Sequence, residues 1–232
     1  MAKHGKKYQS IVSHVKSGVT VPAKEALAKL KELAYAKFDE SIDVSVGLGI
    51  DAAKGEQAVR GSTLLPHGKG KKVRVIVFAK GDYANAATAA GADVVGVEDL
   101  VEKIENGWLE FDVAVATPDL MGLVGKLAKL LGPRGLLPNK KVGTVTFDVG
   151  PVVTDLKKGR AFFKNDKSGY VNFSFGKKSF DVEKLYDNLV AFTKALAASK
   201  PASSKGKFLR KMTISSTMGV GIAISADEVL QS

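Results

Sequence analysis

The sequence predicts a two-domain α/β protein in which one domain is inserted into the other. The outer segments contain alternating strands and two long helices, the middle segment contains short apolar strands between helices, and the positive charge is concentrated in the outer segments. The first pattern is typical of a two-layer α+β domain with an antiparallel sheet and two helices, and the second of a small parallel sheet. We therefore expect a discontinuous domain of residues 1–67 plus 160–232 and an inserted domain of residues 68–159.

The first outer segment reads as a helix followed by a strand. Thr20 can cap a helix that has Pro22 in its first turn. Apolar residues at helical spacing give this helix one buried face: Leu27, Leu30, Ala34 and Phe38. Residues 42–50 then alternate between apolar and polar side chains, which indicates a strand with one buried face.

The second outer segment repeats these patterns. Residues 171–175 alternate like a strand, and residues 181–199 carry apolar side chains at helical spacing, with Pro201 just beyond. From Met212 to Ile224 the apolar residues keep one parity, interrupted by Ser216. The simplest packing of these outer pieces is two helices over one antiparallel sheet.

The middle segment alternates strands and helices. Strands are expected at 73–79, 93–97 and 111–116, and helices at 83–90, 98–105 and 118–131. The last helix is followed by an unusual loop, residues 130–143, in which Gly132 and Pro133 should stop the helix. Arg134, Lys140 and Lys141 project charge from this otherwise apolar loop, either as solvated cations of a structural turn or as a binding feature.

Glycine and charge meet at both crossings between the predicted domains. His67 and Gly68 stand at the first crossing, and Gly159 and Arg160 at the second. Two neighbouring connections permit a rocking motion, so these residues are candidate hinges. Two ordinary rigid loops are the alternative.

The charge of the chain points to a polyanionic partner. There are 35 basic and 24 acidic residues; residues 1–66 and 160–232 hold 22 and 13 of them, a net charge of +9, whereas residues 67–159 hold 13 and 11, a net charge of +2. A surplus of this size favours nucleic acid or an anionic membrane. We expect no signal peptide and no membrane span, because no apolar run is long enough. With no cysteine in the chain, the protein should be cytoplasmic.

The sequence offers little for catalysis. His4, His14 and His67 have no neighbouring residues at metal-ligand spacing, so we expect no metal site and no cofactor. After the strand that ends at Ala79 the chain contains Gly81 but lacks the G-x-G-x-x-G pattern that dinucleotides require. We therefore predict that the protein is not an enzyme. A nucleotide-dependent enzyme that uses the parallel-sheet domain remains the alternative, and charge alone would also fit a nonspecific DNA-binding protein.

Several motifs resemble one protein family. The loop 130–143, with Lys126 to Leu130 before it and Thr144 after it, closely resembles the signature of the universal large-subunit ribosomal protein one family, whose members form the mobile lateral stalk. The resemblance covers nearly the whole chain, through residues 1–8, 36–40, 59–61, 65–68, 163–167, 208–210 and 217–219. Departures are small: Ser41 and Ser168 stand where Thr is common, and Val220 where Pro can follow the glycine.

The resemblance implies both fold and function. It implies a discontinuous RNA-binding domain and an inserted Rossmann-like domain. The expected partners are large-subunit ribosomal RNA, deacylated tRNA in the exit site, whose release the stalk assists, and the mRNA of the protein's own operon, whose translation it represses. The protein would act as a monomer within the ribosome.

The same resemblance, together with side-chain chemistry, gives the candidate RNA-binding residues. They are Lys37, Phe38, Ser41, Arg60, Asp166, Lys167, Ser168, Ser215, Thr217, Met218 and Gly219. Folded RNA is read through its shape, its 2′-hydroxyls and its unstacked bases, which calls for cations mixed with small polar and aromatic groups. The alternatives are that Phe38 ends the first helix as a core residue, that residues 166–168 form a plain polar turn, and that residues 217–219 form a hairpin tip.

Overall fold

A computed structural model describes residues 5–15, 19–52 and 54–231. The chain forms two compact units: unit 1 consists of Met1–Gly70 and Ala161–Ser232, and unit 2 of Lys71–Arg160. The domain limits expected from the sequence differ from these units by three residues at the first crossing and by one at the second. As limits of independently folding or moving domains they stay a prediction.

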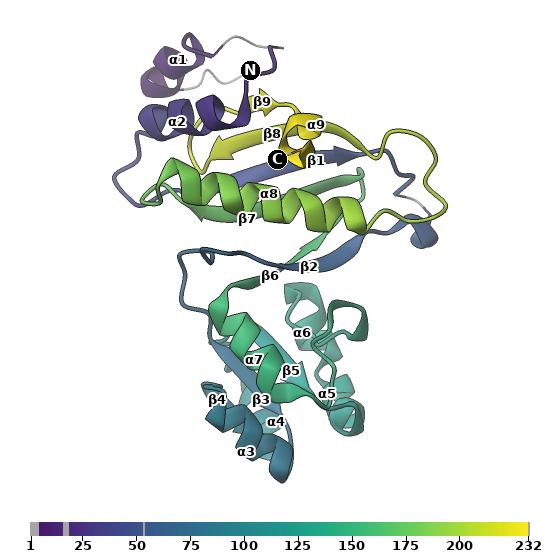
Figure 1. Cartoon of the computed structure of the whole chain (residues 1–232). Coiled ribbons are helices and arrows are strands. Elements are labelled where there is room, and N and C mark those ends of the chain that lie inside the picture. Colours follow the sequence, from purple (N-terminus) through teal and green to yellow (C-terminus); the bar gives the residue numbers. More distant parts are fainter. Residues whose placement is uncertain (1–4, 16–18, 53, 232) are drawn as a thin grey trace. The chain divides into compact units, whose positions relative to one another are not determined.

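Unit 1 is built on a four-stranded antiparallel sheet in the order β7-β1-β8-β9 (Figure 1). Its strands are β1 (Ser41–Leu48), β7 (Tyr170–Lys177), β8 (Leu209–Ser216) and β9 (Ile222–Ile224). The strand β1 lies between β7 and β8, so a strand from before unit 2 is flanked by strands from after it. Apolar residues alternate along each strand, which gives the sheet one apolar face.

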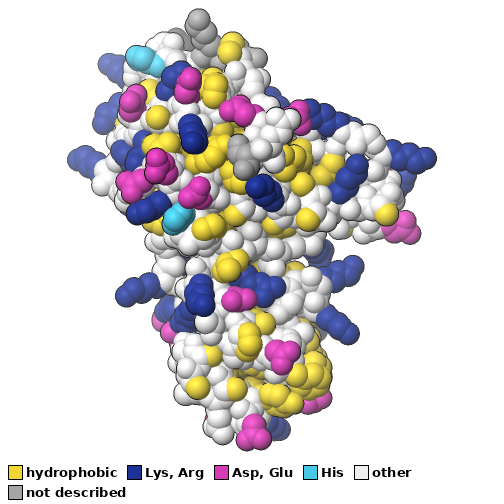
Figure 2. Space-filling view, in the orientation of Figure 1, with side chains coloured by type: hydrophobic (Ala, Val, Ile, Leu, Met, Phe, Trp, Pro, Cys, Tyr) yellow, Lys and Arg dark blue, Asp and Glu magenta, His cyan; other side chains and the backbone are white. Residues whose placement is uncertain are grey.

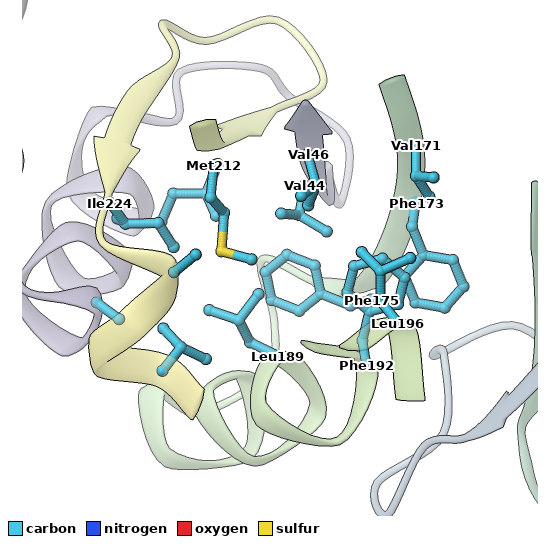
Figure 3. Packing of buried hydrophobic residues seen from close by; sticks show 14 of the residues in the cluster. Val44, Val46, Val171, Phe173, Phe175, Leu189, Phe192, Leu196, Met212 and Ile224 are labelled. Carbon is cyan, nitrogen blue, oxygen red and sulfur yellow. The ribbon is translucent and has the colours of Figure 1, made fainter. Parts of the chain in front are cut away.

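The apolar face of the sheet is covered by α2 (Ala23–Leu33) and α8 (Val182–Ala198). Figure 3 shows Phe173 and Phe175 of β7 lying against Phe192 and Leu189 of α8. The rings of Phe173 and Phe192 stack with centroids 4.3 Å apart, an arrangement that adds to the energy of burial. Two shorter helices, α1 (Lys6–Val12) and α9 (Ala226–Gln231), and the ribbon of β2 (Arg60–Leu64) with β6 (Arg160–Lys164) complete the elements around this core, with a short 3-10 turn, η1 (Gly55–Gln57).

Unit 2 contains a three-stranded parallel sheet in the order β4-β3-β5. The strands β3 (Val75–Phe78), β4 (Val94–Gly96) and β5 (Val113–Ala116) are joined by α3 (Asp82–Ala89) and α4 (Glu98–Glu105). After β5 come η2 (Pro118–Leu120), α5 (Met121–Lys126), α6 (Ala128–Arg134), η3 (Lys140–Val142) and α7 (Val149–Lys158). The fold class expected from the sequence is confirmed: a discontinuous two-layer α+β unit and an inserted unit with a small parallel sheet.

Three local expectations are wrong. The first helix has Pro22, not Thr20, at its N-cap, and it ends at Leu33, so Phe38 is outside it. The chain leaves the helix there because Lys178 Nζ binds the Ala34 carbonyl and the Glu40 carboxylate binds the Ala36 N–H. The third error concerns Pro133, which lies inside α6; the helix ends at Arg134 and is capped by Gly135, with a φ of 71°.

Candidate nucleic-acid interface

Most of the candidate residues at the start of β1 are organised around Glu40. This buried carboxylate accepts hydrogen bonds from the Ala36 N–H at 2.8 Å and from the Met218 N–H at 3.1 Å. It thereby joins the loop that enters β1 to the loop that follows β8. We call this region, residues 34–41, 177–179 and 216–219, the Glu40 corner.

The Glu40 carboxylate is held in its charged form. Burial by itself raises the pKa of Glu40, but hydrogen bonds from the Ser216 hydroxyl and from the Ala36 and Met218 N–H groups, with the charge of Lys178, outweigh burial and lower the pKa below its ordinary value. A charged acceptor makes stronger hydrogen bonds than a neutral one. The two loops of the Glu40 corner are therefore fixed in place at neutral pH.

Thr217 uses its hydroxyl within the protein. Its Oγ1 accepts a hydrogen bond from the Ser41 N–H at 3.0 Å and donates to the Ser41 carbonyl at 3.2 Å, while its own N–H donates to the same carbonyl at 3.1 Å. A hydroxyl has one proton and two lone pairs. The Thr217 hydroxyl therefore keeps one acceptor position for a further partner, and its bonds to Ser41 position the loop after β8.

Gly219 lies where a side chain does not fit. A Cβ at this position would collide with the Ser216 Oγ, the group that bonds Glu40. The absence of a side chain at Gly219 therefore protects the Glu40 corner as well as leaving room for a ligand to approach the backbone.

Two large apolar side chains project into solvent from the Glu40 corner. Phe38 is 54% exposed and Met218 is 50% exposed. Phe38 is thus not a core residue, contrary to the alternative reading. Lys37 is also exposed, and the Ser41 hydroxyl accepts a hydrogen bond from Lys177 Nζ at 2.9 Å. The corner therefore presents apolar, cationic and hydroxyl groups together, as base and backbone recognition requires.

Asp166, Lys167 and Ser168 form a second group, in the turn between β6 and β7. Asp166 Oδ1 accepts hydrogen bonds from the N–H groups of Ser168 at 2.9 Å and Tyr170 at 2.8 Å, and Gly169 has a φ of 79°. One carboxylate oxygen thus builds the turn. The other oxygen, with the exposed side chains of Lys167 and Ser168, is available to a partner.

The two groups lie at opposite ends of β1. Ser41 pairs with Lys177 and Gly47 with Tyr170, so the strand places about 20 Å between the Glu40 corner and the Asp166 turn at about 3.4 Å per residue. Arg60 lies beside the Asp166 turn, because its neighbour Val59 binds Asn165 through both backbone groups. The structure therefore separates the predicted residues into two groups rather than one patch.

The sheet face opposite the helices connects these groups and is polar. Paired residues form rows across it: Ser174–Asp43–Ser215, Asn172–Ser45–Thr213 and Tyr170–Gly47–Lys211. All are half-buried or exposed except Gly47, where a side chain would press on the Tyr170 ring. Of these residues only Ser215 was singled out from the sequence. Strand parity could have found the others, since they alternate with the buried residues.

The four candidate hinge residues are held by different partners. The His67 N–H donates to Asn188 Oδ1 at 3.1 Å, the Gly68 carbonyl accepts from Asn188 Nδ2 at 2.9 Å, and His67 Nε2 lies 2.9 Å from Asp187. Gly159 caps α7 with a φ of 116°, and Arg160 lies 3.8 Å from Asp155. A hinge at these positions stays a prediction.

Unit 2 does not offer a nucleotide site at the expected edge of its sheet. The chain after β3 has Gly81 and then Asp82 in the first turn of α3, a charge that opposes phosphate binding. A groove of about 480 Å³ lies elsewhere, lined by Val94, Lys103, Asn106 and Trp108, at the start of β4. Within residues 5–15, 19–52 and 54–231, no three His, Cys, Asp or Glu residues gather as a metal site.

His4 lies outside the described residues. Among the helices that the structure describes, none combines the length and the apolar character needed to span a bilayer.

Fold and surface together define a two-unit α/β protein with a polar sheet face between two groups of loop residues. Comparisons with known proteins identify its family. The model of the ribosomal protein L1p/L10e family matches residues 30–220, and the large ribosomal subunit protein uL1 of Azoarcus sp. (strain BH72) is 53% identical over 224 residues, 97% of each chain. The chain belongs to the ribosomal protein L1p/L10e family, and the resemblance found in the sequence is confirmed.

Proposed function

We propose that the protein is a non-catalytic constituent of the large ribosomal subunit that binds ribosomal RNA at the lateral stalk. The observation that carries this proposal is the Glu40 corner, where one carboxylate aligns the loops of Phe38 and Met218. Family membership and the similarity to the Azoarcus relative, a large ribosomal subunit protein, support it. The net charge of +11 supplies the attraction to RNA, and the polar groups supply selectivity.

The polar sheet face fits the shape of folded RNA. A-form RNA exposes its 2′-hydroxyls along a wide and shallow minor groove, which small polar side chains such as Ser45, Asn172 and Thr213 can approach. Carboxylates accept hydrogen bonds from 2′-hydroxyls, and Asp43 and Asp166 supply them near the Glu40 corner and at the opposite end of the face. We propose that one RNA segment runs from the Glu40 corner along this face to the Asp166 turn.

Two finer activities complete the proposal. As a monomer of the stalk, in the cytoplasm, the protein assists release of deacylated tRNA from the exit site, and it represses its own operon by binding a similar fold in the mRNA. Ribosomes that carry an RNA-binding variant should release exit-site tRNA more slowly in a rapid-mixing assay. Unchanged release would remove this part of the proposal and leave ribosomal RNA binding intact.

Phe38 provides the direct test of the RNA site. Phe38→Ala should weaken binding to a stalk RNA fragment by about 1–3 kcal/mol, the range for a lost base–aromatic contact, in a filter-binding or calorimetric titration. The operon leader RNA should lose affinity by the same factor. Phe147→Ala is the matched control, because Phe147 is a similarly exposed phenylalanine, at 47%, in unit 2.

Equal affinities of the Phe38 and Phe147 variants would exclude Phe38 from the site. Equal affinity of the unaltered protein for stalk RNA and for an unrelated duplex at the same salt concentration would sink the proposed function itself. Loss of stalk RNA binding without loss of leader binding would show that the leader RNA does not use the same site.

A further inference from the structure

The charge of unit 2 is strongly divided, although its sum is small. Residues 71–160 carry 13 basic and 11 acidic residues. The stretch 120–147 holds five of the basic residues and no acidic one, so the remainder of the unit has eight basic and 11 acidic residues. The segment thus has a net charge of +5 and the rest of the unit a net charge of −3.

The topology keeps this basic segment at one edge of the sheet. Residues 120–147 follow β5 directly through η2, and they return to β5 where Val145 bridges Ala116 in parallel. The segment is therefore an excursion from the end of β5 that begins and ends at the same strand. Acidic residues of the unit lie outside this segment; Glu98, Asp99, Glu102 and Glu105 are on α4, which packs against α5.

The cations of this segment have no acidic partner. Lys126, Lys129, Arg134, Lys140 and Lys141 are all exposed, and none of their side chains forms an ion pair or hydrogen bond with any residue that the structure describes. Elsewhere in the unit, four basic side chains that the structure describes lie close to acids, among them Lys71 at 2.6 Å from Asp112 and Lys157 at 2.5 Å from Asp93. Figure 2 shows dark blue side chains at the edge of unit 2 where Figure 1 draws α6.

The backbone that carries these cations is fixed by internal contacts. Asn139 Oδ1 accepts the Lys141 N–H at 2.8 Å, and the Thr144 hydroxyl accepts the Asn139 N–H at 2.8 Å. Leu136 and Leu137 pack on the core of the unit and Pro138 is buried, so the apolar side of the loop faces inward. The cations therefore occupy a rigid, outward-facing surface.

Several exposed glycines let a large partner approach this surface closely. Side chains added at Gly122, Gly125 and Gly132 would meet nothing within 4 Å. A rigid array of unpaired cations with little side-chain bulk between them suits the regular phosphates of a nucleic-acid helix. A membrane surface would call for a band of exposed apolar side chains, whereas the exposed large apolar side chains of this segment are Leu130, at 44%, and Phe147, at 47%.

We infer that the surface formed by Lys126, Lys129, Arg134, Lys140 and Lys141 is a second RNA-binding site, which contacts the phosphate backbone of a double-helical RNA without reading its sequence. This site is separate from the sheet face of unit 1, and it does not depend on the function proposed above.

A pair of full-length variants with equal charge tests this inference. The test variant carries Gln at Lys126, Lys129, Lys140 and Lys141. The control variant carries Gln at Lys72, Lys80, Lys103 and Lys158, which are exposed lysines of the same unit that lie outside the segment and form no ion pair with any described residue. Both variants lose the same charge, and RNA contacts made through unit 1 are common to both. A difference between them therefore reports local phosphate contacts.

The probe is a plain 20-base-pair RNA duplex, titrated at 50 and 200 mM salt. Each phosphate contact adds about 0.7 to 0.9 to the exponent with which affinity falls as salt rises. With four contacts more than the test variant, the unaltered protein and the control variant should lose about 50- to 150-fold more affinity than it does between 50 and 200 mM salt. Circular dichroism and Tm establish that both variants are folded. A second titration uses deacylated tRNA in place of the duplex. If the test variant loses more affinity for tRNA than for the duplex, the site is assigned to tRNA; if the two losses are equal, it is assigned to RNA helices in general.

Equal affinity and equal salt dependence of the two variants would overturn the inference. An equal loss of binding to poly-glutamate and to duplex RNA in the test variant would also overturn it, because the surface would then be a general anion-binding surface. Loss of stalk RNA binding in the Phe38 variant is a separate result and leaves this comparison unaffected.

Discussion

Glu40 illustrates how one buried charge can position a binding surface made of other residues. Its two oxygens bind N–H groups from loops that lie 182 residues apart, at Ala36 and Met218. Neither partner is a charged side chain, so the carboxylate supplies the only full charge in these contacts. The exposed Phe38 and Met218 side chains then need no packing of their own to be held near each other.

Replacement of Glu40 by Gln should destabilise the protein and weaken RNA binding. A Gln amide presents one oxygen and one NH2 group to several donors, so one N–H is left facing another donor, at a cost of about 1–3 kcal/mol in the free energy of unfolding. Urea unfolding measures this cost. Glu32→Gln, an exposed change on α2, is the control and should leave stability unchanged.

The same variant gives a pH dependence with a definite sign. The pKa of Glu40 is lower in the folded protein than in the unfolded chain, so its stabilisation is complete above the unfolded pKa and is lost as pH falls through the folded pKa. The difference in unfolding free energy between the unaltered protein and the Gln variant should therefore be full at pH 7 and shrink in acid. A difference that grows in acid would contradict the assigned role.

Among the helices, α8 connects the most separate parts of unit 1. Its Asn188 is fully buried and binds the Phe175 carbonyl of β7 at 2.8 Å, in addition to His67 and Gly68. One side chain thus ties the chain that leaves β2 to the core of the unit. If a hinge exists at the first crossing, this helix limits how far motion can spread into unit 1.

Asn188→Ala should release the segment at His67 and Gly68. Three hydrogen bonds are lost, and buried backbone groups left without partners cost about 1–3 kcal/mol in unfolding free energy. Hydrogen exchange measured by NMR should accelerate at the His67 N–H. Asn85→Ala, an exposed asparagine on α3, is the control. Unchanged exchange at His67 would mean that other contacts hold this segment.

The sequence predicts some helix ends better than others. An end set by neighbouring residues can be predicted, whereas an end set by a contact with a distant residue cannot. The helix expected at 181–199 is α8, because Asp181 at its N-cap, continuous apolar spacing and Pro201 are all local signals. The end of α2 was missed because it depends on Lys178, which is distant in sequence. The short α7 and the β2–β6 ribbon were not expected, since neither has a strong period.

The candidate site shows the same division between local and distant signals. The use of Asp166 in a polar turn follows from its neighbours, and the structure has that turn. The sequence could not predict that the Thr217 hydroxyl hydrogen-bonds to Ser41, because the two residues meet only through the pairing of β1 with β8. Glu40 lies in the motif 36–40 that resembles the family, but its hydrogen bonds to both loops depend on the pairing of β1 with β8.

On the scale of the whole molecule, each unit has a hydrophobic core of its own. The core of unit 1 includes Leu189 and that of unit 2 includes Leu127, both with no exposed surface. Two cores in one chain need not unfold in a single transition. The single tryptophan, Trp108, packs on Phe111 in unit 2 and therefore reports on that unit.

Leu127→Ala and Leu189→Ala should act on different transitions. Each removes a buried leucine side chain, which costs about 2–5 kcal/mol. We expect Leu127→Ala to shift the denaturant midpoint of Trp108 fluorescence, and Leu189→Ala to shift the hydrogen exchange of β1 instead. Equal shifts of both probes in both variants would show that the chain unfolds as one cooperative body.

The position of β1 between β7 and β8 bears on how the protein is made. Its neighbours begin only at Tyr170 and Leu209, so during synthesis β1 has no partner strand until most of the chain has left the ribosome. Unit 2, whose strands all lie between Val75 and Ala116, can form earlier. The sheet face of unit 1 proposed for RNA is therefore completed last, and a chain that stops before β8 lacks Ser215, Thr217, Met218 and Gly219.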